Sequence, residues 1–306
     1  MPIDPGAEFH AMTPSSYLVT ALFEIARPKH WVKNAFVFAP LIFAKRVGDP
    51  DSVLQASLAF ILFGLFSSCV YMLNDIVDLE RDRQHPGKCR RPLPSGRLTI
   101  RQVAAAIAAC FVVASLGAAA LSWKFLLVGW SYGALNVLYS YHCRSIVILD
   151  GMFIAAGFVL RAYAGAVVIE ADFSDWLYIC AIFVSLFLAF SKRRHEILLL
   201  GDEQAKDHRA ILEEYSLHLL DQIIAIVAAA TVVSYSLYCI DFTHPTATGS
   251  MKYTLPFVIY GMFRYLYLVY RREEGGNPTE LLLSDRPLLL NGLLWLVVVF
   301  WALYGL

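Results

Sequence analysis

The sequence predicts an all-α protein, a polytopic membrane bundle of about nine transmembrane helices. Its 306 residues are 58% hydrophobic and only 16% charged, and the mean hydropathy is +0.57. A chain of this composition is too apolar and too poor in charge for an ordinary soluble domain. Apolar runs of about 20 residues recur along the chain, and each is long enough to cross about 30 Å of hydrocarbon. These observations favour a helical membrane protein.

The predicted elements begin with an interfacial helix at 15–27, which has a polar start and then apolar residues at helical spacing. The transmembrane spans follow in order at 30–46, 52–79, 99–121, 123–142, 146–169, 175–195, 216–241, 252–271 and 287–305. No linker or low-complexity tract separates them. We therefore expect one integral-membrane domain over 1–306, with residues 1–14 as a flexible or vector-derived stretch and no cleavable signal peptide.

The loop charges predict how the chain is oriented in the membrane. Of the 25 Lys and Arg residues, Arg161 and Arg264 lie within spans. The loops opposite the N-terminus hold four others: Lys45, Arg46, Lys124 and Lys252. The remaining 19 lie on the side of the N-terminus. Because cytoplasmic loops carry an excess of Lys and Arg, we expect a cytoplasmic N-terminus and active site, and a C-terminus outside.

Composition also excludes several function classes. The net charge is zero and the basic residues lie in short loops, which argues against binding to nucleic acid. The six cysteines are scattered without paired spacing, so they are expected to be reduced thiols and not a disulfide framework or a metal site. The sequence contains no Walker-type glycine loop, zinc-type spacing, nucleophile elbow or c-type haem motif.

The stretch from Asn74 to Asp82 ends the second span and carries three aspartates. At about 100° per residue, Asp75, Asp78 and Asp82 fall within about 60° of one another on one helix face. Carboxylates clustered near a bilayer need a positive partner, because each costs roughly 2.5 to 3.5 kcal/mol at the centre of a span. Their hard oxygen ligands favour Mg²⁺, which bridges readily to substrate phosphates. The alternative is a solvated helix end.

Basic side chains flank this acidic stretch. The loop 81–101 holds seven Lys or Arg residues, among them Lys88 and Arg91. Lys33 lies a turn inside the first span, where it serves either as a positive-inside anchor or as a phosphate ligand. Carboxylates for a metal beside basic groups for phosphate oxygens indicate a diphosphate site.

Asp150 and Arg161 are charged residues inside the fifth span. An ionised group in a span needs a partner, so Asp150 is either a functional acid or half of a structural ion pair. Arg161 follows about 16 Å farther along the helix, on nearly the same face. Binding of an anionic headgroup or a substrate phosphate and a buried ion pair are equally compatible with Arg161.

The sixth span ends in a basic cluster, which usually marks the flank of a membrane span. Within it, Lys192 and Arg193 are candidate phosphate ligands and Glu196 adds a carboxylate. His195 fits a polar interfacial residue better than a base. Arg264 lies about two turns inside the eighth span, where its side chain can reach the interface by snorkelling.

The pattern Asn74-Asp75-x-x-Asp78-x-x-x-Asp82 resembles the first aspartate-rich motif of the UbiA superfamily of intramembrane prenyltransferases. Within that superfamily the sequence is most similar to the decaprenyl-phosphate phosphoribosyltransferase branch. The other stretches that carry this likeness are Arg27-Pro28-Lys29-His30-Trp31-Val32-Lys33-Asn34, His85-Pro86-x-Lys88, Arg91-Pro92, Tyr139-Ser140, Asp150, Leu160-Arg161-Ala162, Lys192-Arg193-Arg194-His195-Glu196, Arg264-Tyr265 and Asp285-Arg286. They extend over nearly the whole chain.

This resemblance implies that 5-phosphoribosyl 1-diphosphate and a polyprenyl phosphate react to give polyprenyl-phosphoryl-5-phosphoribose and diphosphate, for cell-envelope glycolipid synthesis in a bacterial-type plasma membrane. It implies that Asp75, Asp78 and Asp82 hold Mg²⁺, and that Asp150 is catalytic with them, against the ribose or a second metal. The substrate-binding residues that it implies are Lys33, Asn74, Lys88, Arg91, Tyr139, Arg144, Arg161, Lys192, Arg193, Glu196 and Arg264. The lipid tail is expected along the spans among membrane lipids, and assembly into a homo-oligomer stays open.

Two departures from the superfamily pattern bear on the choice of substrate. Members that use a prenyl diphosphate typically carry a second pair of acids four residues apart, but Ile154 stands where the partner of Asp150 would be. This argues for the phosphoribosyl branch. Arg144 stands where the branch usually has lysine, so the geometry there can differ. The alternatives are a UbiA-type prenyltransferase acting on an aromatic or other small acceptor, and a non-catalytic lipid-binding or transport protein.

Overall fold

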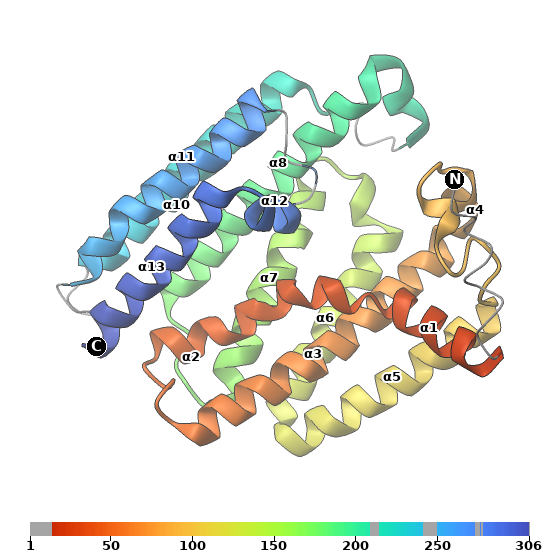
Figure 1. The fold of residues 1–306 in the computed structure, drawn as a ribbon, viewed down its shortest axis with the longest axis horizontal. Helices are drawn as coiled ribbons and strands as arrows, with labels where there is room; N and C mark the ends of the chain where they lie inside the picture. Colours follow the sequence, from red (N-terminus) through yellow and green to blue (C-terminus); the bar gives the residue numbers. More distant parts are fainter. Residues whose placement is uncertain (1–13, 209–213, 241–249, 273–275, 277, 306) are drawn as a thin grey trace, which may run out of the picture.

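The computed structural model describes residues 14–208, 214–240, 250–272, 276 and 278–305, and within these ranges it contains helices but no strand (Figure 1). The α-helices are α1 (Pro14–Ala26), α2 (Ala39–Phe43), α3 (Pro50–Val77), α4 (Leu79–Gln84), α5 (Ile100–Leu121), α6 (Trp123–Tyr141), α7 (Leu149–Val168), α8 (Asp175–His208), α10 (Leu217–Ile240), α11 (Leu255–Arg271), α12 (Pro278–Ser284) and α13 (Arg286–Tyr304). The 3₁₀ helices are η2 (Pro28–Phe38), η3 (Lys88–Arg90), η4 (Cys143–Ser145) and η5 (Met251–Thr254). The predicted all-α class is confirmed.

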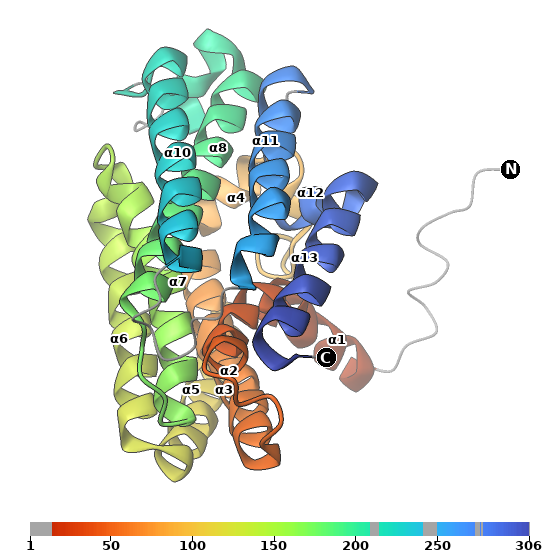
Figure 2. The ribbon, with the colours of Figure 1, turned by 90° about the vertical axis from the view of Figure 1, so that its left-hand side faces the viewer.

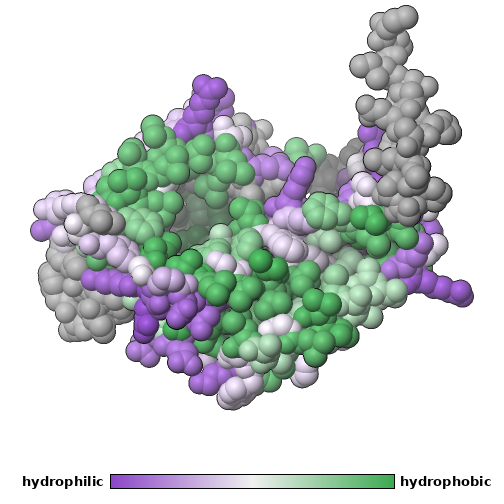
Figure 3. All heavy atoms as spheres, turned by 60° about the horizontal axis from the view of Figure 1, so that its bottom comes forward, coloured by the Kyte–Doolittle hydropathy of each residue, from purple (hydrophilic) through white to green (hydrophobic). Residues whose placement is uncertain are grey.

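Six of the described helices are long and apolar enough to cross a membrane: α3, α5, α7, α10, α13 and the part of α8 up to Leu199. Apolar side chains also cover much of the surface seen in Figure 3. The chain is therefore a multi-pass membrane protein, as predicted. The other three predicted spans are helical as well, as η2 with α2, α6 and α11. Because α11 has only 17 residues, the predicted count of nine crossing helices is not established.

Local sequence signals explain where several helices begin. Asp49 caps α3 by accepting a hydrogen bond from the backbone N–H of Asp51, and a proline follows at the first helical position. Thr99 and Gln102 form a capping box at the start of α5. Asp285 caps α13 by accepting from the backbone N–H of Leu288. These signals are local, so the helix starts can be predicted from them without knowledge of the tertiary contacts.

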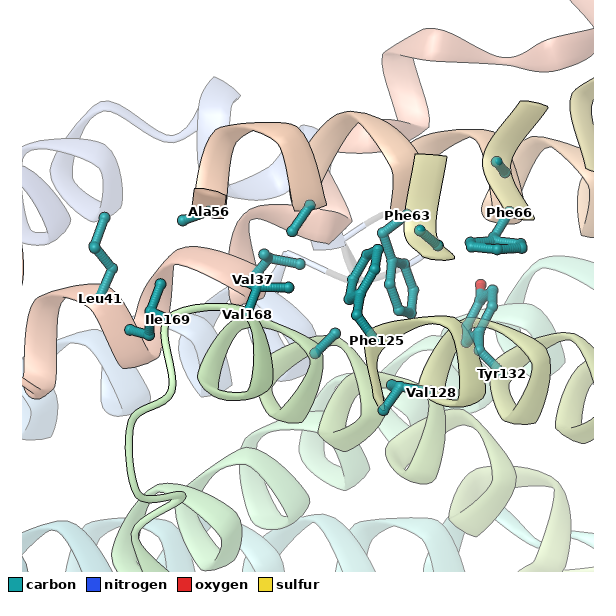
Figure 4. Packing of buried hydrophobic residues seen from close by; sticks show 14 of the residues in the cluster. Val37, Leu41, Ala56, Phe63, Phe66, Phe125, Val128, Tyr132, Val168 and Ile169 are labelled. Atoms are coloured by element: carbon teal, nitrogen blue, oxygen red, sulfur yellow. The ribbon is translucent and has the colours of Figure 1, made fainter. Parts of the chain in front are cut away.

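The N-terminal half of the bundle packs around α3, which contacts η2, α5, α6 and α7. Phe63 and Phe66 of α3 meet Phe125 and Tyr132 of α6 in the largest aromatic part of this core (Figure 4). The ring centroids of Phe63 and Tyr132 lie 4.8 Å apart. Burial of four aromatic rings at one helix crossing holds α3 and α6 in a fixed relation.

A glycine allows η2 to lie directly against α7. A Cβ atom at Gly165 would overlap the backbone carbonyl of Val37, so only glycine permits this approach. Lys33 and Asn34 of η2 are thereby placed beside the helix that carries Arg161.

The C-terminal half is a layer in which α8 packs against α10, α10 against α11, and α11 against α13 (Figure 2). Contacts between α7 and α8 join this layer to the N-terminal half. The start of α7 and the later part of α8 therefore lie close together. We use the term polar end for the end of the bundle formed by the last turn of α3, α4, the start of α7 and residues 192–196 of α8.

Two helix boundaries at the polar end differ from the prediction. The predicted continuous span 52–79 is interrupted, because α3 ends at Val77 and α4 begins at Leu79, with Asp78 between them outside helical geometry. The predicted loop after residue 195 is partly helical, because α8 continues to His208. The predicted interfacial helix 15–27 corresponds to α1, and residues 1–13 lie outside the described residues.

Candidate active site

At the polar end, Asp75 in the last turn of α3 and Asp82 in α4 share one cation. Both aspartates are buried, with 3% and 2% of their surface exposed. Nη1 of Arg91 lies 3.3 Å from Oδ1 of Asp75 and 2.7 Å from Oδ2 of Asp82. Arg27 also pairs with Asp75, and Nζ of Lys88 lies 3.6 Å from Asp82. The acids and the loop cations singled out in the sequence therefore form one network.

Asp78 pairs with a different set of cations. Its Oδ1 accepts a hydrogen bond from Nη1 of Arg144 at 2.8 Å and lies 3.7 Å from Arg81. This separation follows from the break between α3 and α4, because a continuous helix would place all three aspartates on one stripe. The predicted stripe is thus divided between Arg91 on one side and Arg144 on the other.

The carboxylates fit a divalent cation in their chemistry. In the described part of the chain, no three His, Cys, Asp or Glu side chains converge closely enough to hold a metal ion. However, Arg91 places a positive charge between two buried carboxylates, in the position from which a divalent cation would reach both. Carboxylate oxygens are the ligands that Mg²⁺ takes in proteins.

Asn74 connects α3 to the end of α6. Its Oδ1 lies 2.7 Å from Oγ of Ser140, and the single hydroxyl proton of Ser140 is shared between Asn74 and the backbone carbonyl of Asn136. Through this link the segment after α6, which carries Arg144, is held beside the aspartates. Asn74 thus holds α3 and the end of α6 together at the site.

Asp150, at the start of α7, is fully buried and paired. Nε of Arg193 donates to its Oδ2 at 2.6 Å, while the two Nη atoms of Arg193 donate to Glu196 at 2.6 Å and to the hydroxyl of Tyr139 at 3.3 Å. Arg193 is only 3% exposed. Its donors are therefore directed at protein groups, which leaves it in a position to orient its neighbours and not to contact a phosphate directly.

Tyr215 completes this network, and no sequence pattern indicated it. Its hydroxyl donates to Oδ1 of Asp150 at 2.7 Å and accepts from the backbone N–H of Ile148 at 2.6 Å. Burial and the hydrogen bond to Asp150 raise the pKa of Tyr215. The residue lies between the predicted spans 175–195 and 216–241, so only the fold brings it to Asp150.

The remaining predicted cations differ in their surroundings. Lys192 is about half exposed, with its Nζ 3.7 Å from Glu196. Arg161 is buried and hydrogen-bonds to neutral groups, namely Oδ1 of Asn34 at 2.9 Å and the hydroxyl of Tyr132 at 2.7 Å. The expected alternative of an ion pair for Arg161 is therefore not present among the described residues.

Arg264 belongs to a separate ion pair in the C-terminal layer. Its Nη2 lies 2.8 Å from Oδ2 of Asp285, and its Nε donates to Oδ1 at 3.2 Å. The hydrogen bond from Arg264 lowers the pKa of Asp285. This pair joins α11 to the start of α13, and α11 packs against α10, α13 and η5 and not against α3.

Comparison with known proteins places this geometry in a family. Residues 35–201 match the model of the UbiA prenyltransferase family. The chain is 32% identical to the decaprenyl-phosphate phosphoribosyltransferase of Corynebacterium glutamicum, over 95% of this chain and 89% of the relative. It is 31% identical to the enzyme of the same name from Mycolicibacterium smegmatis, over 95% of each.

The fold is also similar to solved structures. A UbiA homolog from Archaeoglobus fulgidus, bound to GPP and Mg²⁺, superposes with a TM-score of 0.72 at 19% sequence identity. The match covers 92% of this chain and 99% of that one. The helical arrangement described above is therefore the one found in that homolog.

Proposed function

The chain belongs to the UbiA prenyltransferase family, and we propose that it transfers 5-phosphoribose from 5-phosphoribosyl 1-diphosphate to a polyprenyl phosphate of the decaprenyl type, releasing diphosphate. The observation that carries this proposal is the identity of 31–32% with decaprenyl-phosphate phosphoribosyltransferases over 95% of the chain. The network of aspartates and paired cations at the polar end supports it, because the reaction must hold two anionic substrates and stabilise the departing diphosphate.

The acceptor needs no strong general base, because a phosphate oxygen is already anionic. Catalysis then depends on placing the two substrates together and on stabilising the leaving group. Arg91 and Lys88 lie on the loop beside Asp75 and Asp82, and they exchange these carboxylates for phosphate oxygens when the donor binds. Such charge-assisted bonds from arginine to phosphate are among the strongest that a side chain makes.

Mg²⁺ would be held by Asp75, Asp78 and Asp82, and when bound it supplies positive charge to the leaving diphosphate. Arg144, which pairs with Asp78, would be a further cation for a substrate phosphate at this site. The pairing of every one of these aspartates with an arginine holds the acids in place before the donor and the metal arrive.

Asp150 acts through Arg193. Both oxygens of the buried carboxylate are engaged, one by Arg193 and one by Tyr215, so this acid orients Arg193 and, through it, Glu196. Lys192, on the exposed side of the same helix, is left as the phosphate ligand of this segment. We place this polar end on the cytoplasmic side, where the excess of Lys and Arg lies and where phosphorylated sugars are found.

The test is transfer of labelled phosphoribose to lipid by purified protein with Mg²⁺, the labelled donor and a polyprenyl phosphate. Asp75→Asn is expected to lower the rate by at least about a hundredfold, since one metal ligand and one arginine partner are lost. Glu80→Gln is the matched control, because Glu80 is an exposed acid of α4 that pairs with Arg83 at the surface. Labelled lipid that fails to form, or product formed from a prenyl diphosphate and an aromatic acid instead, would overturn the proposal.

A further inference from the structure

Arg161 is a buried cation without an acidic partner in the described residues. It lies within α7, is 5% exposed, and donates only to Asn34 and Tyr132. Its guanidinium carbon lies 4.9 Å from the ring centroid of Phe158 and 4.8 Å from that of Tyr132. Aromatic rings attract a cation but carry no net negative charge. A charge inside a membrane span needs a counter-charge, and here a ligand must provide it.

Two groups near Arg161, the ammonium of Lys33 and the side-chain amide of Asn34, also have hydrogen-bond donors without an acceptor among the described residues. Lys33 has no ion pair or hydrogen bond within the described part of the chain, and the charged groups that act on it most strongly are all positive: Lys192, Arg161 and Arg27. Nδ2 of Asn34 is buried without a hydrogen-bond partner. A buried donor without a partner beside two cations is an arrangement that an anion satisfies.

This cationic group adjoins an apolar cavity. In a 3₁₀ helix, residues three apart lie on one face, so Lys33 and Phe36 share a side of η2. Phe36 lines a cavity of about 560 Å³, whose other walls are mainly apolar residues of α2, α8 and α10. Arg46, Glu170 and Asp172 also line this cavity, in the segments that follow α2 and α7. The ring of Phe36 packs edge-on against that of Phe158, with the ring centroids 5.0 Å apart. The guanidinium of Arg161 lies over the same Phe158 ring. Figure 3 shows a hollow ringed by apolar side chains.

We propose that Lys33, Arg161 and the side-chain amide of Asn34 bind the phosphate of the lipid acceptor, while the aspartates of the polar end hold the donor diphosphate. This inference rests on the proposed function, which supplies two phosphorylated substrates. The group around Arg161 contains no carboxylate among the described residues, so it takes a phosphate without a metal. A headgroup with one or two negative charges matches two cations, and the adjoining cavity accepts apolar chain.

The donor fits this position less well. A diphosphate carries more charge and is the substrate that a metal-binding carboxylate cluster requires. It also lacks an apolar part that would use the cavity. If the group around Arg161 held the donor's 5-phosphate instead, its loss would weaken donor binding and leave lipid binding unchanged.

The first experiment measures binding of farnesyl phosphate to the purified full-length protein in EDTA, without donor. The variants are Arg161→Gln and Lys33→Gln, and the uncharged probe is farnesol. Each variant is expected to weaken binding of farnesyl phosphate by about tenfold to about a hundredfold, the effect of losing one bond to a charged group. Farnesol binding is expected to stay the same. Lys252→Gln, which removes an exposed cation from η5, is the control.

The second experiment separates the two substrates in steady-state kinetics. Both variants should raise the KM for the lipid phosphate by at least about tenfold and leave the KM for the donor within about twofold. A rise in the donor KM with an unchanged lipid KM would overturn the inference. If both variants bind the lipid phosphate and form product as the unmodified protein does, this inference alone is overturned. If binding of the lipid phosphate depends on Arg161 but the protein makes no labelled lipid, only the proposed function is overturned.

The thermal stability of Arg161→Gln distinguishes a ligand-binding role of Arg161 from a merely structural one, because the two roles predict opposite effects of the substitution. Because Arg161 lacks a counter-charge, Arg161→Gln without ligand should unfold at the same temperature as the unmodified protein or higher. Farnesyl phosphate should stabilise the unmodified protein and not the variant. A variant that is destabilised yet binds the lipid phosphate normally would assign Arg161 to packing. Lys33→Gln, on a less buried side chain, keeps the test available if Arg161→Gln does not fold.

Discussion

Replacing Tyr215 by phenylalanine removes one of the two side chains that hold the buried Asp150. The phenol donates to Oδ1 of Asp150 at 2.7 Å, and Asp150 is 0% exposed, so no water takes the place of the lost bond. A hydrogen bond to a charged group contributes about 1.5 to 3 kcal/mol. The backbone N–H of Ile148, which also bonds to this hydroxyl, belongs to an exposed residue and can turn to water. We expect the free energy of unfolding to fall by about 2 kcal/mol.

The assay is thermal unfolding in detergent, where about 1 kcal/mol corresponds to about 2 °C for a chain of this size. Tyr215→Phe should therefore unfold about 4 °C lower than the unmodified protein. Tyr265→Phe is the matched control, because Tyr265 is also buried but its hydroxyl has no hydrogen-bond partner among the residues that the structure describes. Removing that hydroxyl is expected to be neutral or slightly stabilising. Equal unfolding temperatures for the two variants would refute the reasoning.

The same pair of variants gives a pH prediction. The pKa of Tyr215 is raised above the value of about 10 in the unfolded chain. The neutral phenol is therefore the form that the fold favours, so its contribution is complete below about pH 10 and is lost as the pH rises through the raised pKa. The difference between the unmodified protein and Tyr215→Phe should be constant from about pH 6 to about pH 9. A difference that fades within this range contradicts the assignment.

Three further outcomes are expected. Gly165→Ala should lower the free energy of unfolding by about 1 to 3 kcal/mol, because the added Cβ meets the carbonyl of Val37. Its control is Gly133→Ala, which should be neutral or stabilising because the space around its Cβ is open. Asp285→Asn should cost at most about 1 kcal/mol at pH 7, because its pair with Arg264 is partly exposed. Since the pKa of Asp285 is lowered, this loss in unfolding temperature should be present above about pH 4 and fade as the pH falls further. EDTA should abolish transfer to lipid and Mg²⁺ should restore it, while binding of farnesyl phosphate persists.

The membrane class and the helix positions were predictable from the sequence because they depend on local properties. The length of an apolar run, a capping residue such as Thr99 and a proline at a helix start act within a few residues of themselves. Each of the nine predicted spans consequently falls on a helical segment. The aspartates at 75, 78 and 82 were also singled out by their spacing and by the family resemblance. The structure brings Asp75 and Asp82 together with the predicted Lys88 and Arg91, whereas Asp78 pairs with the predicted Arg144.

The break at Asp78 was not predictable from periodicity. Periodicity predicts a regular helix that continues through Asp78. It takes no account of Leu79, which packs with Met72, Leu93 and Leu98 in a buried cluster. Burial of Leu79 against residues of the following loop favours a turn at Asp78. The helix therefore ends where a tertiary contact, and not a local signal, requires it.

That charged residues inside the spans need partners can be read from the residues alone, but the identity of each partner depends on how the helices pack. Asp150 pairs with Arg193, 43 residues away, and not with Arg161 on its own helix. Arg161 instead faces Asn34, 127 residues away, and is left without a counter-charge. The charge and the apolar length of a span follow directly from its residues. Which partner a charged side chain contacts depends instead on how the neighbouring helices are rotated and packed relative to one another.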